Sequence, residues 1–443
     1  MKEIDNHPNW KFCHTVDKAV IEIHQTANDF RIAIVDFKYK PDDHQFGEIL
    51  DHIRRRNIPY IVYSYFPRDV EKYPDFKGED ELRIGVIPKS TDAGGVLAER
   101  VVAFFKAPPV RILHLSDLHY DSNAKGAKSE EQKDLFDSLL STLKEEHENN
   151  KFDAITITGD FSSENPEGDL DKVSEFINNL VNKTMEFDNI GRLFLVPGNH
   201  DLYWKDFEKG IISETPWRPY LDFYQSVYAS QDNILEVLNA WNPKNRFFDK
   251  KAVNEDLLWN RKILDPAINI IGLVTPSVDP AEKGMGNFDR KQEDFVRENW
   301  KTKPVFGEVR IALMHHNLFP TLSLSPYDEK YVLKKSTNAF YSLIKSQCNI
   351  VLNGHTHSPN VYCLSAGNFS TNGYENADQL IVSSTGNTSG AHPSNDRPRC
   401  FNILEFMDAD KDTGARNLNV RPFIYESAHR KWVAKKTCQF KIT

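Results

Sequence analysis

Two histidines stand two residues apart where a predicted strand ends, in the stretch LNGHTHS at residues 352–358. In an extended segment, residues i and i+2 lie on the same side of the backbone, so His355 and His357 can reach toward one point. Gly354, just before them, lets the backbone approach whatever lies there. This spacing suggests a metal site with imidazole ligands, and the alternative is a solvated turn with two incidental histidines.

Four further motifs share this design, an apolar strand whose last residues are of metal-ligand types. The carboxyl ends of strands in a parallel or mixed α/β sheet line one rim where ligands bind, so the five motifs can converge. Taken singly, Asp160 could be a helix cap and Asn199 a turn residue, but the ordered set favours a metal site. The candidates are Asp117 and His119 in SDLH, Asp160 in TGD, Asn199, His200 and Asp201 in PGNHD, His315 and His316 in MHH, and His355 and His357 in NGHTH.

Composition limits the class of protein. The chain has 443 residues, of which 40% are hydrophobic and 27% charged, as is typical of a globular protein with two or three folded units. Five scattered cysteines predict a reduced, cytoplasmic setting without disulfides or a cysteine zinc site. A net charge of -9 does not favour indiscriminate binding along duplex phosphate, but it leaves room for a local basic groove. No run approaches the roughly 20 apolar residues of a membrane helix, and no secretory signal is expected.

Strands that alternate with helices must position these motifs, which predicts a parallel sheet. His114 falls inside the first strand and is expected to be a hydrogen-bonded core histidine. A helix is predicted from the capping box at Ser129 to about His147, and another over residues 169–183. The predicted strands are VRILHLSDLHY (110–120), DAITITGD (153–160), RLFLVPGNHD (192–201), INIIGLVT (268–275), VRIALMHH (309–316) and NIVLNGH (349–355), followed by strand-like patches at QLIVSST, CFNILEF, VRPFIY and KWVAKK.

Two domains are expected, divided at the paired prolines 108 and 109, which predict a stiff linker. Residues 1–107 alternate strands at 31–36, 58–64 and 82–88 with helices, so a small parallel α/β domain is predicted there. Within residues 110–443, an aromatic-rich insertion at about 203–262 is expected to form a cap over the site. Its aromatic rings could stack a base, or they could form a hydrophobic core of their own.

The motif order resembles that of the calcineurin-like metallophosphoesterase family, which is D-x-H, G-D, G-N-H-D/E, a lone H and G-H-x-H. The resemblance covers about residues 110–443. It implies a four-layer α/β/β/α sandwich, in which two mixed sheets are flanked by helices and two metal ions lie at the strand ends. It also implies hydrolysis of a phosphoester by attack of a hydroxide that bridges the metals.

The resemblance implies a role for each candidate. One metal site would consist of Asp117, His119, Asp160 and His357, and the other of Asp160, Asn199, His315 and His355, with Asp160 bridging. Nitrogen and oxygen donors without cysteine favour Mn²⁺, with Fe, Zn, Ni or Co as alternatives, over Mg²⁺ or Ca²⁺ alone.

The resemblance makes His200 a substrate-facing residue that stabilises the transition state or protonates the leaving oxygen, with Asp201 orienting its imidazole. The family's lone histidine commonly reads H-x-P, which selects His315. The stretch here is HHNLFP, without proline at that place, so His316 stays an alternative.

The substrate class is narrowed by what the motifs lack. Protein serine/threonine phosphatases of this superfamily carry G-D-x-x-D-R-G and G-N-H-E, whereas this chain has GDFSSEN and GNHD. A phosphodiesterase acting on a nucleotide or a nucleic acid is therefore predicted. The alternatives are a phosphomonoesterase and a non-catalytic signalling or scaffold protein.

Residues 1–107 also resemble a response-regulator receiver domain. Asp36, Ser64 and Lys89 stand where receivers have the phosphoacceptor, a switch hydroxyl and a phosphate-contacting lysine. The acidic pair that binds Mg²⁺ after a first strand is missing. A degenerate receiver-like fold with a regulatory or dimerising role is expected, by analogy only, because any parallel α/β domain puts polar residues at strand ends.

Overall fold

The structure is a computed structural model, and it describes only part of the chain. The described residues are 33–37, 49–53, 60–64, 83–88, 109–163, 166–184, 192–204, 216–229, 258–263, 268–279, 282, 284–301, 304, 307–319, 332–366, 378–389, 398–410 and 414–442. The chain divides into two compact units. The first consists of Met1–Ala107, Thr302–Glu308 and Asp410–Gly414, and the second of Pro108–Lys301, Val309–Ala409 and Ala415–Thr443.

The first unit contains a three-stranded parallel sheet in the order β1-β2-β3, so the parallel sheet predicted for this region is confirmed. Its strands are β1 (Ala33–Phe37), β2 (Tyr60–Ser64) and β3 (Arg83–Pro88). Asp36 lies near the end of β1 and Ser64 ends β2, whereas Lys89 is outside the described residues. The receiver-like interpretation stays a prediction.

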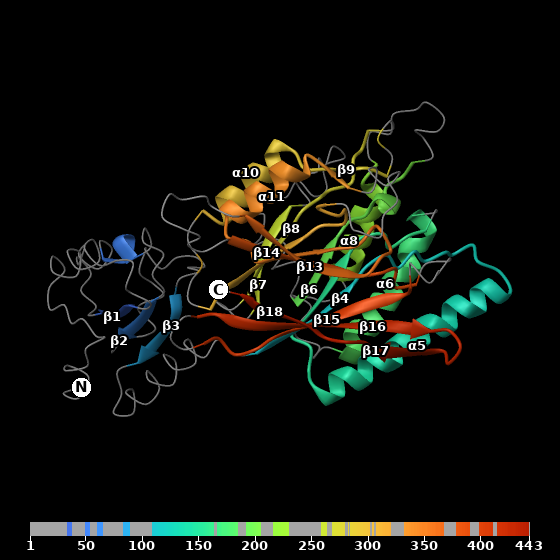
Figure 1. The fold of residues 1–443 in the computed structure, drawn as a ribbon, viewed down its shortest axis with the longest axis horizontal. Coiled ribbons are helices and arrows are strands. Elements are labelled where there is room, and N and C mark those ends of the chain that lie inside the picture. The colour runs from blue at the N-terminus through green and yellow to red at the C-terminus, as the bar shows by residue number, and fades with distance from the viewer. Residues whose placement is uncertain are drawn as a thin grey trace. The chain divides into compact units, whose positions relative to one another are not determined.

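The second unit contains two large mixed sheets, one of seven strands and one of six (Figure 1). In the first, β4, β5 and β6 are parallel, and β15 joins β4 antiparallel, with β16, β17 and β18 continuing the antiparallel part. Its strands are β4 (Val110–Leu115), β5 (Ala154–Thr158), β6 (Leu193–Val196), β15 (Cys400–Phe406), β16 (Arg416–Glu426), β17 (Lys431–Ala434) and β18 (Cys438–Ile442).

The six-stranded sheet has a parallel centre and antiparallel edges, in the order β13-β14-β12-β10-β8-β7. Its strands are β7 (Trp259–Ile263), β8 (Ile268–Gly272), β10 (Val309–Leu313), β12 (Ile350–Asn353), β13 (Asn360–Ala366) and β14 (Asp378–Ser384). A small pair, β9 (Gly286–Asn287) and β11 (Leu333–Lys334), lies apart from both. The strands predicted to carry the five motifs are therefore confirmed.

Side chains along each strand point alternately toward the other sheet and toward the helices outside, so the second unit has four layers, helices, sheet, sheet and helices. Ile112 of β4 belongs to the core between the two sheets, whereas Leu113 belongs to the core under the helices on the outer face. The six-stranded sheet repeats this, with Ile311 facing inward and Ala312 facing outward. The helices are α5 (Ala127–Asn149), α6 (Pro166–Thr184) and α8 (Arg218–Ala229) on one side, and α10 (Arg290–Asn299) and α11 (Ser336–Lys345) on the other.

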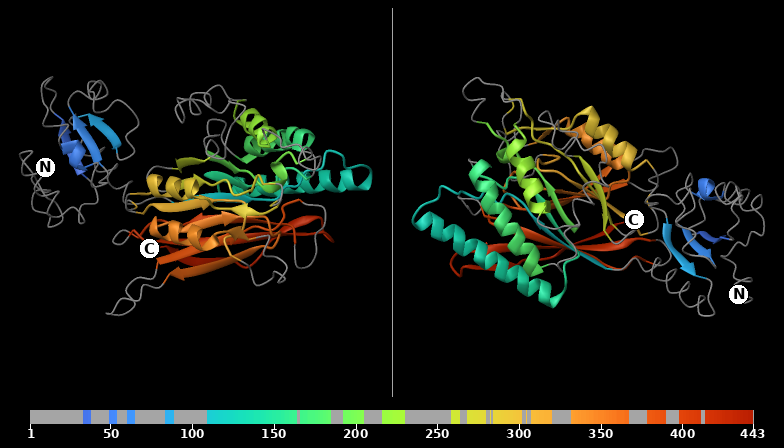
Figure 2. Two further views of the ribbon diagram at one scale, coloured as in Figure 1. Left: turned by 90° about the horizontal axis from the view of Figure 1, so that it is seen from above. Right: turned by 180° about the vertical axis from the view of Figure 1, so that it is seen from behind.

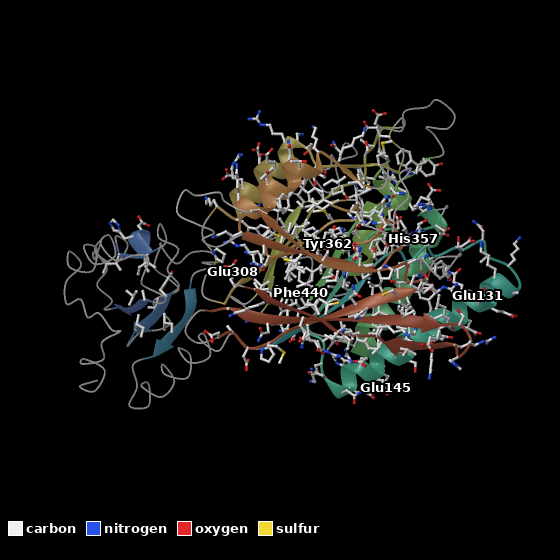
Figure 3. All side chains as sticks on the ribbon, in the orientation of Figure 1. Glu131, Glu145, Glu308, His357, Tyr362 and Phe440 are labelled. Atoms are coloured by element: carbon white, nitrogen blue, oxygen red, sulfur yellow. The ribbon has the colours of Figure 1, made fainter. Side chains whose placement is uncertain are left out.

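The pictures show the same layering. In Figure 1, α10 and α11 lie at the top of the second unit and α5 at its lower right, with strands of both sheets between them. The two further views in Figure 2 agree. Tyr362 and Phe440, labelled in Figure 3, are partly buried against the outer and the inter-sheet cores respectively. The expected α/β/β/α sandwich is confirmed.

The predicted start of the first long helix is wrong. α5 begins at Ala127 rather than at a capping box on Ser129, and its N-cap residue, Gly126, makes no side-chain cap. Gly126 has a φ of 58°, a conformation that glycine adopts without steric cost, and its carbonyl accepts from the Ser129 amide. Ser129 therefore lies inside the first turn.

The aromatic segment after the GNHD motif forms part of the core where it is described. α8 was not predicted, and its Tyr220, Phe223, Tyr224 and Tyr228 are buried in the cluster beneath α5 and α6. These rings are not available to stack a base. Trp241, Phe247 and Phe248 lie outside the described residues. Among the described helices, none combines the length and apolar character needed to cross a membrane.

Candidate metal centre

The loops that follow the strands are tied together by backbone hydrogen bonds. The Asp117 amide donates to the Gly159 carbonyl at 2.9 Å, and the His119 amide donates to the Asp160 carbonyl at the same distance. On the other sheet, the Gly354 amide donates to the His315 carbonyl at 3.0 Å. Each sheet thus brings its own motifs side by side.

Gly354 lets its backbone approach the loop after β4 closely, as expected of a glycine at this place. A Cβ at this position would overlap Ser116 Oγ and Asp117 Oδ2, so glycine is needed where the two sheets approach each other. The next amide, that of His355, donates to both oxygens of Asp117, at 3.1 and 3.0 Å. The close approach therefore joins the loop after β12 to the loop after β4.

Several candidate ligands have an unusual backbone. The described residues include eight non-glycine residues with positive φ, and five of them are the candidates Asp117 (53°), His119 (43°), Asp160 (50°), His355 (70°) and His357 (56°). This left-handed conformation is uncommon for residues with a Cβ and persists where surrounding structure enforces it, often at functional sites. The backbone strain is concentrated where the candidate ligands lie.

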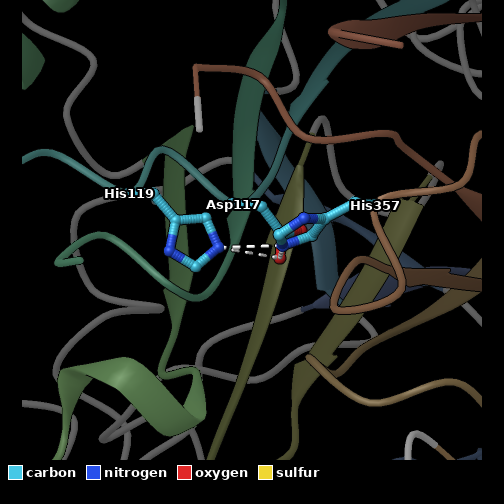
Figure 4. A group of neighbouring side chains, drawn as sticks. All are labelled: Asp117, His119 and His357. Atoms are coloured by element: carbon cyan, nitrogen blue, oxygen red, sulfur yellow. Dashed lines mark hydrogen bonds and ion pairs between the residues drawn. The ribbon is translucent and has the colours of Figure 1, made fainter. Parts of the chain in front are cut away.

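Asp117, His119 and His357 form one group (Figure 4). Asp117 Oδ1 lies 3.3 Å from His357 Nε2 and 3.7 Å from His119 Nε2. The two Nε2 atoms are only 2.9 Å apart. Asp117 is fully buried, whereas the side chains of His119 and His357 are 9% and 27% exposed, so this group faces solvent on one side.

Asp160, His315 and His355 form a second, buried group. His315 Nε2 lies 3.1 Å from Asp160 Oδ2, 3.1 Å from His355 Nδ1 and 3.2 Å from the Asn199 side-chain oxygen. The other nitrogen of His315, Nδ1, donates to the Thr158 carbonyl at 2.7 Å, which leaves Nε2 as the ring nitrogen that faces the group.

Asp160 touches both groups. Its Oδ2 atom lies 3.6 Å from His119 Nε2 as well as 3.1 Å from His315 Nε2. A third set of possible ligand atoms consists of His119, Asp160 and His200. The structure therefore brings together all seven residues expected to bind metal, with Asp160 in the position expected of a bridging ligand.

Asp160 and His315 are buried together, and each shifts the pKa of the other in the direction that favours opposite charges. Burial alone would raise the pKa of Asp160, but the neighbouring His315 and His200 lower it well below its usual value. Burial would likewise lower the pKa of His315, but the charge of Asp160 opposite raises it to about 9.

The donor set fits divalent metal ions. Ring nitrogens that face one another at 2.9 and 3.1 Å cannot both present lone pairs without a proton or a cation between them. The available donors are carboxylate oxygen, amide oxygen and imidazole nitrogen, which suit Mn, Fe, Zn, Ni and Co. The residues brought together here therefore suit divalent metal binding.

The structure distinguishes the two adjacent histidines after β10. His315 points its Nε2 atom at Asp160, whereas His316 Nδ1 makes a hydrogen bond to Thr275 Oγ1 at 2.9 Å and its ring packs on the His355 ring, with centroids 4.2 Å apart. Burial lowers the pKa of His316 to about 3, so this ring stays neutral. His315 is the one that lies among the candidate ligands.

The role expected for Asp201 is wrong. Its Oδ1 accepts from the Phe161 and Ser162 amides at 2.8 and 3.1 Å, and its Oδ2 accepts from the Gly198 amide at 2.7 Å. The carboxylate therefore holds the backbone of two motif loops together and does not orient a side chain.

His200 instead makes its hydrogen bond through Nδ1, to the Ser163 carbonyl at 2.5 Å. The imidazole is exposed, and its ring lies edge-on to His119, with centroids 4.8 Å apart. Sequence patterns could not indicate Ser163 as the partner of His200, because the contact uses a backbone oxygen that every residue type has. His114, by contrast, is a buried core histidine bonded to Thr158 Oγ1, as predicted.

Comparison with known proteins identifies the family. The family model described as calcineurin-like phosphoesterase matches residues 110–359, more than half of the chain, and the chain therefore belongs to the calcineurin-like phosphoesterase family. Membership supports phosphoester hydrolysis with divalent metal ions as the general activity. No curated protein matches the chain.

Solved structures give distant matches. A Staphylococcus aureus protein assigned as a 5′-nucleotidase matches at 11% identity and a TM-score of 0.37, over 75% of this chain and 54% of that one. The NAD nucleotidase of Haemophilus influenzae matches at 11% and 0.34, over 74% and 54%. A Mycoplasma pneumoniae phosphatase matches at 13% and 0.30, over 75% and 93%. The chain spans about half the length of the two nucleotidases.

Proposed function

We propose that this chain is a dinuclear metal-dependent phosphodiesterase that acts on a nucleotide or a nucleic acid. The observation that carries the proposal is the position of Asp160, whose carboxylate lies within 3.6 Å of ring nitrogens from both groups of candidate ligands. One ion would be held by Asp117, His119, Asp160 and His357, and the other by Asp160, Asn199, His315 and His355.

Two divalent ions bound there would neutralise the phosphoryl oxygens and activate the attacking water. With only two carboxylates among these ligands, the loaded centre would keep a net positive charge, which suits an anionic phosphoester. Asn199 contributes to this excess because its amide oxygen binds metal without adding negative charge.

His200 is the proposed acid. A carbonyl oxygen can only accept, so the hydrogen bond to Ser163 places a proton on Nδ1 and leaves Nε2 to face the substrate. In the doubly protonated ring, Nε2 also carries a proton, which it can donate to the departing oxygen or use to stabilise the charge that develops on it.

The preference for diesters is supported by sequence features of the same loops. Ser163 stands where protein phosphatases of this superfamily have the aspartate of Asp-Arg-Gly, and Asp201 stands where they have glutamate. A monoesterase is the main alternative. A non-catalytic scaffold is disfavoured by the exposed and oriented His200.

The test compares substrates on one preparation loaded with Mn²⁺. Bis-p-nitrophenyl phosphate should be hydrolysed faster than p-nitrophenyl phosphate, and a cyclic nucleotide or an oligonucleotide faster than a phosphoprotein. Faster monoester turnover would favour the phosphomonoesterase alternative. Bound metal without turnover of any substrate would favour the scaffold. Loading the same preparation with Fe, Zn, Ni or Co identifies the preferred ion.

Residues 1–107 are proposed to be regulatory or to form a dimer. Mass photometry of the full chain and of residues 110–443 tests this, because only the full chain should dimerise. A monomeric full chain with the same activity as the shorter one would contradict both roles.

A further inference from the structure

Asp169 is a buried acidic residue in the first turn of α6, and nothing described so far uses it. It is 1% exposed. Its Oδ1 atom accepts from the Ser122 amide at 2.7 Å and from the Ser122 hydroxyl at 2.6 Å. Its Oδ2 atom accepts from the Ser162 hydroxyl at 2.8 Å and from the Ser163 amide at 3.2 Å. One carboxylate thus joins the loop after His119 to the loop after Asp160.

The second of these loops holds the imidazole of His200. Ser163 accepts from His200 Nδ1 through its carbonyl, and its amide donates both to Asp169 and to the Tyr120 carbonyl, the latter at 3.0 Å. The position of the Ser163 carbonyl therefore depends on the hydrogen bonds that Ser162 and Ser163 make to Asp169 and to the Tyr120 carbonyl.

We propose that Asp169 is a positioning residue for His200, acting through the backbone of Ser163. By holding this loop, Asp169 keeps the Ser163 carbonyl in place. That carbonyl accepts from His200 Nδ1 and so leaves Nε2 to face the substrate. This inference rests on the proposed function of His200. It gives Asp169 the orienting role that the sequence suggested for Asp201, but through a carbonyl instead of direct contact.

The chemistry of the four donors explains why a carboxylate is needed. The amides of Ser122 and Ser163 can only donate, and they bind different oxygens of Asp169. An asparagine at this position would turn its NH₂ group toward one of these amides. Asp169→Asn therefore removes a buried hydrogen bond while preserving size, which makes it the informative variant.

Two controls match this variant. Asp171→Asn makes the same change of charge at an exposed position of the same helix. Ser162→Ala removes one hydroxyl donor to Asp169 but leaves both backbone amides bound. Asp169→Asn should keep its metal content and lose about 10–100-fold in kcat on a substrate with a poor leaving group, such as a dinucleotide. The loss on bis-p-nitrophenyl phosphate should be much smaller, because p-nitrophenolate needs little protonation. Asp171→Asn should behave like wild type, and Ser162→Ala should lose less kcat than Asp169→Asn because both backbone amides stay bound to Asp169.

A double-mutant cycle separates positioning from a general structural effect. If Asp169 acts through His200, adding Asp169→Asn to His200→Ala should cause no further loss of kcat. A further loss equal to that in the wild-type background would overturn the proposal. So would loss of bound metal in Asp169→Asn alone, because Asp169 would then support the metal ligands instead.

A measurement without metal or substrate distinguishes failure of this inference from failure of the proposed function. In the metal-free chain labelled with ¹⁵N-histidine, the long-range ¹H–¹⁵N spectrum of the neutral His200 ring should show the Nδ1-protonated tautomer. The signal is assigned by its absence in His200→Gln. Asp169→Asn should mix the two tautomers. An Nε2-protonated ring in wild type, or an unchanged tautomer in the variant, would overturn the proposal. Absence of phosphoesterase activity would instead contradict the proposed function.

Discussion

The two sheets of the second unit contribute different chemistry to the candidate metal centre. The seven-stranded sheet provides both carboxylates and the amide, together with His119 and the exposed His200. The six-stranded sheet provides only imidazoles, those of His315, His355 and His357. Neither sheet carries a full set of ligands. The contacts between them are short, since Asp117 lies 3.3 Å from His357 and Asp160 lies 3.1 Å from His315.

Because its candidate ligands come from both sheets, the centre depends on how the two sheets pack against each other. A large buried apolar cluster lies between the sheets, and it holds the strand ends of both sheets at one rim. The carboxylates then attract imidazoles across the gap, which is why burial and charge have opposing effects on the pKa of Asp160 and His315. Substitutions in one sheet, in the other sheet and in the core between them should therefore affect the centre to different degrees.

The largest effect is expected from Asp160→Ala on the seven-stranded sheet. This change removes the carboxylate that contacts ring nitrogens from both groups of candidate ligands, that of His119 in one and that of His315 in the other. Both ions should be lost, and activity should fall to background. Metal analysis by inductively coupled plasma mass spectrometry, with Asp171→Asn as the control, checks this. A variant that retains two ions would show that Asp160 does not bridge.

A smaller effect is expected from the six-stranded sheet, where two adjacent histidines provide a matched pair. His315→Ala should lose one ion of the two, because its Nε2 atom points at Asp160 and Asn199. His316→Ala should keep both ions with about 10-fold weaker affinity, because it only supports the His355 ring. Metal titration of the two variants compares them. The opposite ranking would make His316 the ligand.

The sequence predicted these ligands because each depends on a short local pattern, an apolar run followed by polar residues. The carboxyl ends of the strands in a parallel or mixed sheet lie along one rim, so these polar residues come together regardless of the conformation of the loops between the strands. It could not predict the partners of Asp201 and His200, since those partners are backbone amides and a carbonyl whose positions depend on the whole loop.

The same limit applies to the fold. The strands were predictable from runs of apolar residues, but α8 was not, because its buried aromatics resemble those of an exposed cap until their contacts with α6 are known. The capping box at Ser129 predicted the wrong start for α5 for a similar reason. The positive φ of Gly126 starts the helix earlier, and a side-chain pattern does not show it.

The smallest effect on the centre is expected from the core that joins the sheets. Leu404 of β15 is fully buried there, and Leu404→Ala should lower the free energy of unfolding by about 2–5 kcal/mol. Its two ions should be retained at saturating Mn²⁺. The control is Met407→Ala, which changes a nearby residue that is 44% exposed and should stay within about 0.5 kcal/mol of wild type. Urea denaturation compares them, and equal stability would show that this core does not hold the sheets together.

Hydrolysis of bis-p-nitrophenyl phosphate as metal is removed and restored tests the proposed dinuclear centre most directly. Protein stripped with EDTA and dialysed should be inactive. Activity should return with Mn²⁺ and reach its maximum at two ions per chain, because Asp160 contacts both groups of candidate ligands and is proposed to bridge two ions. Undiminished activity in the metal-free protein, or full activity at one ion per chain, would contradict a dinuclear centre.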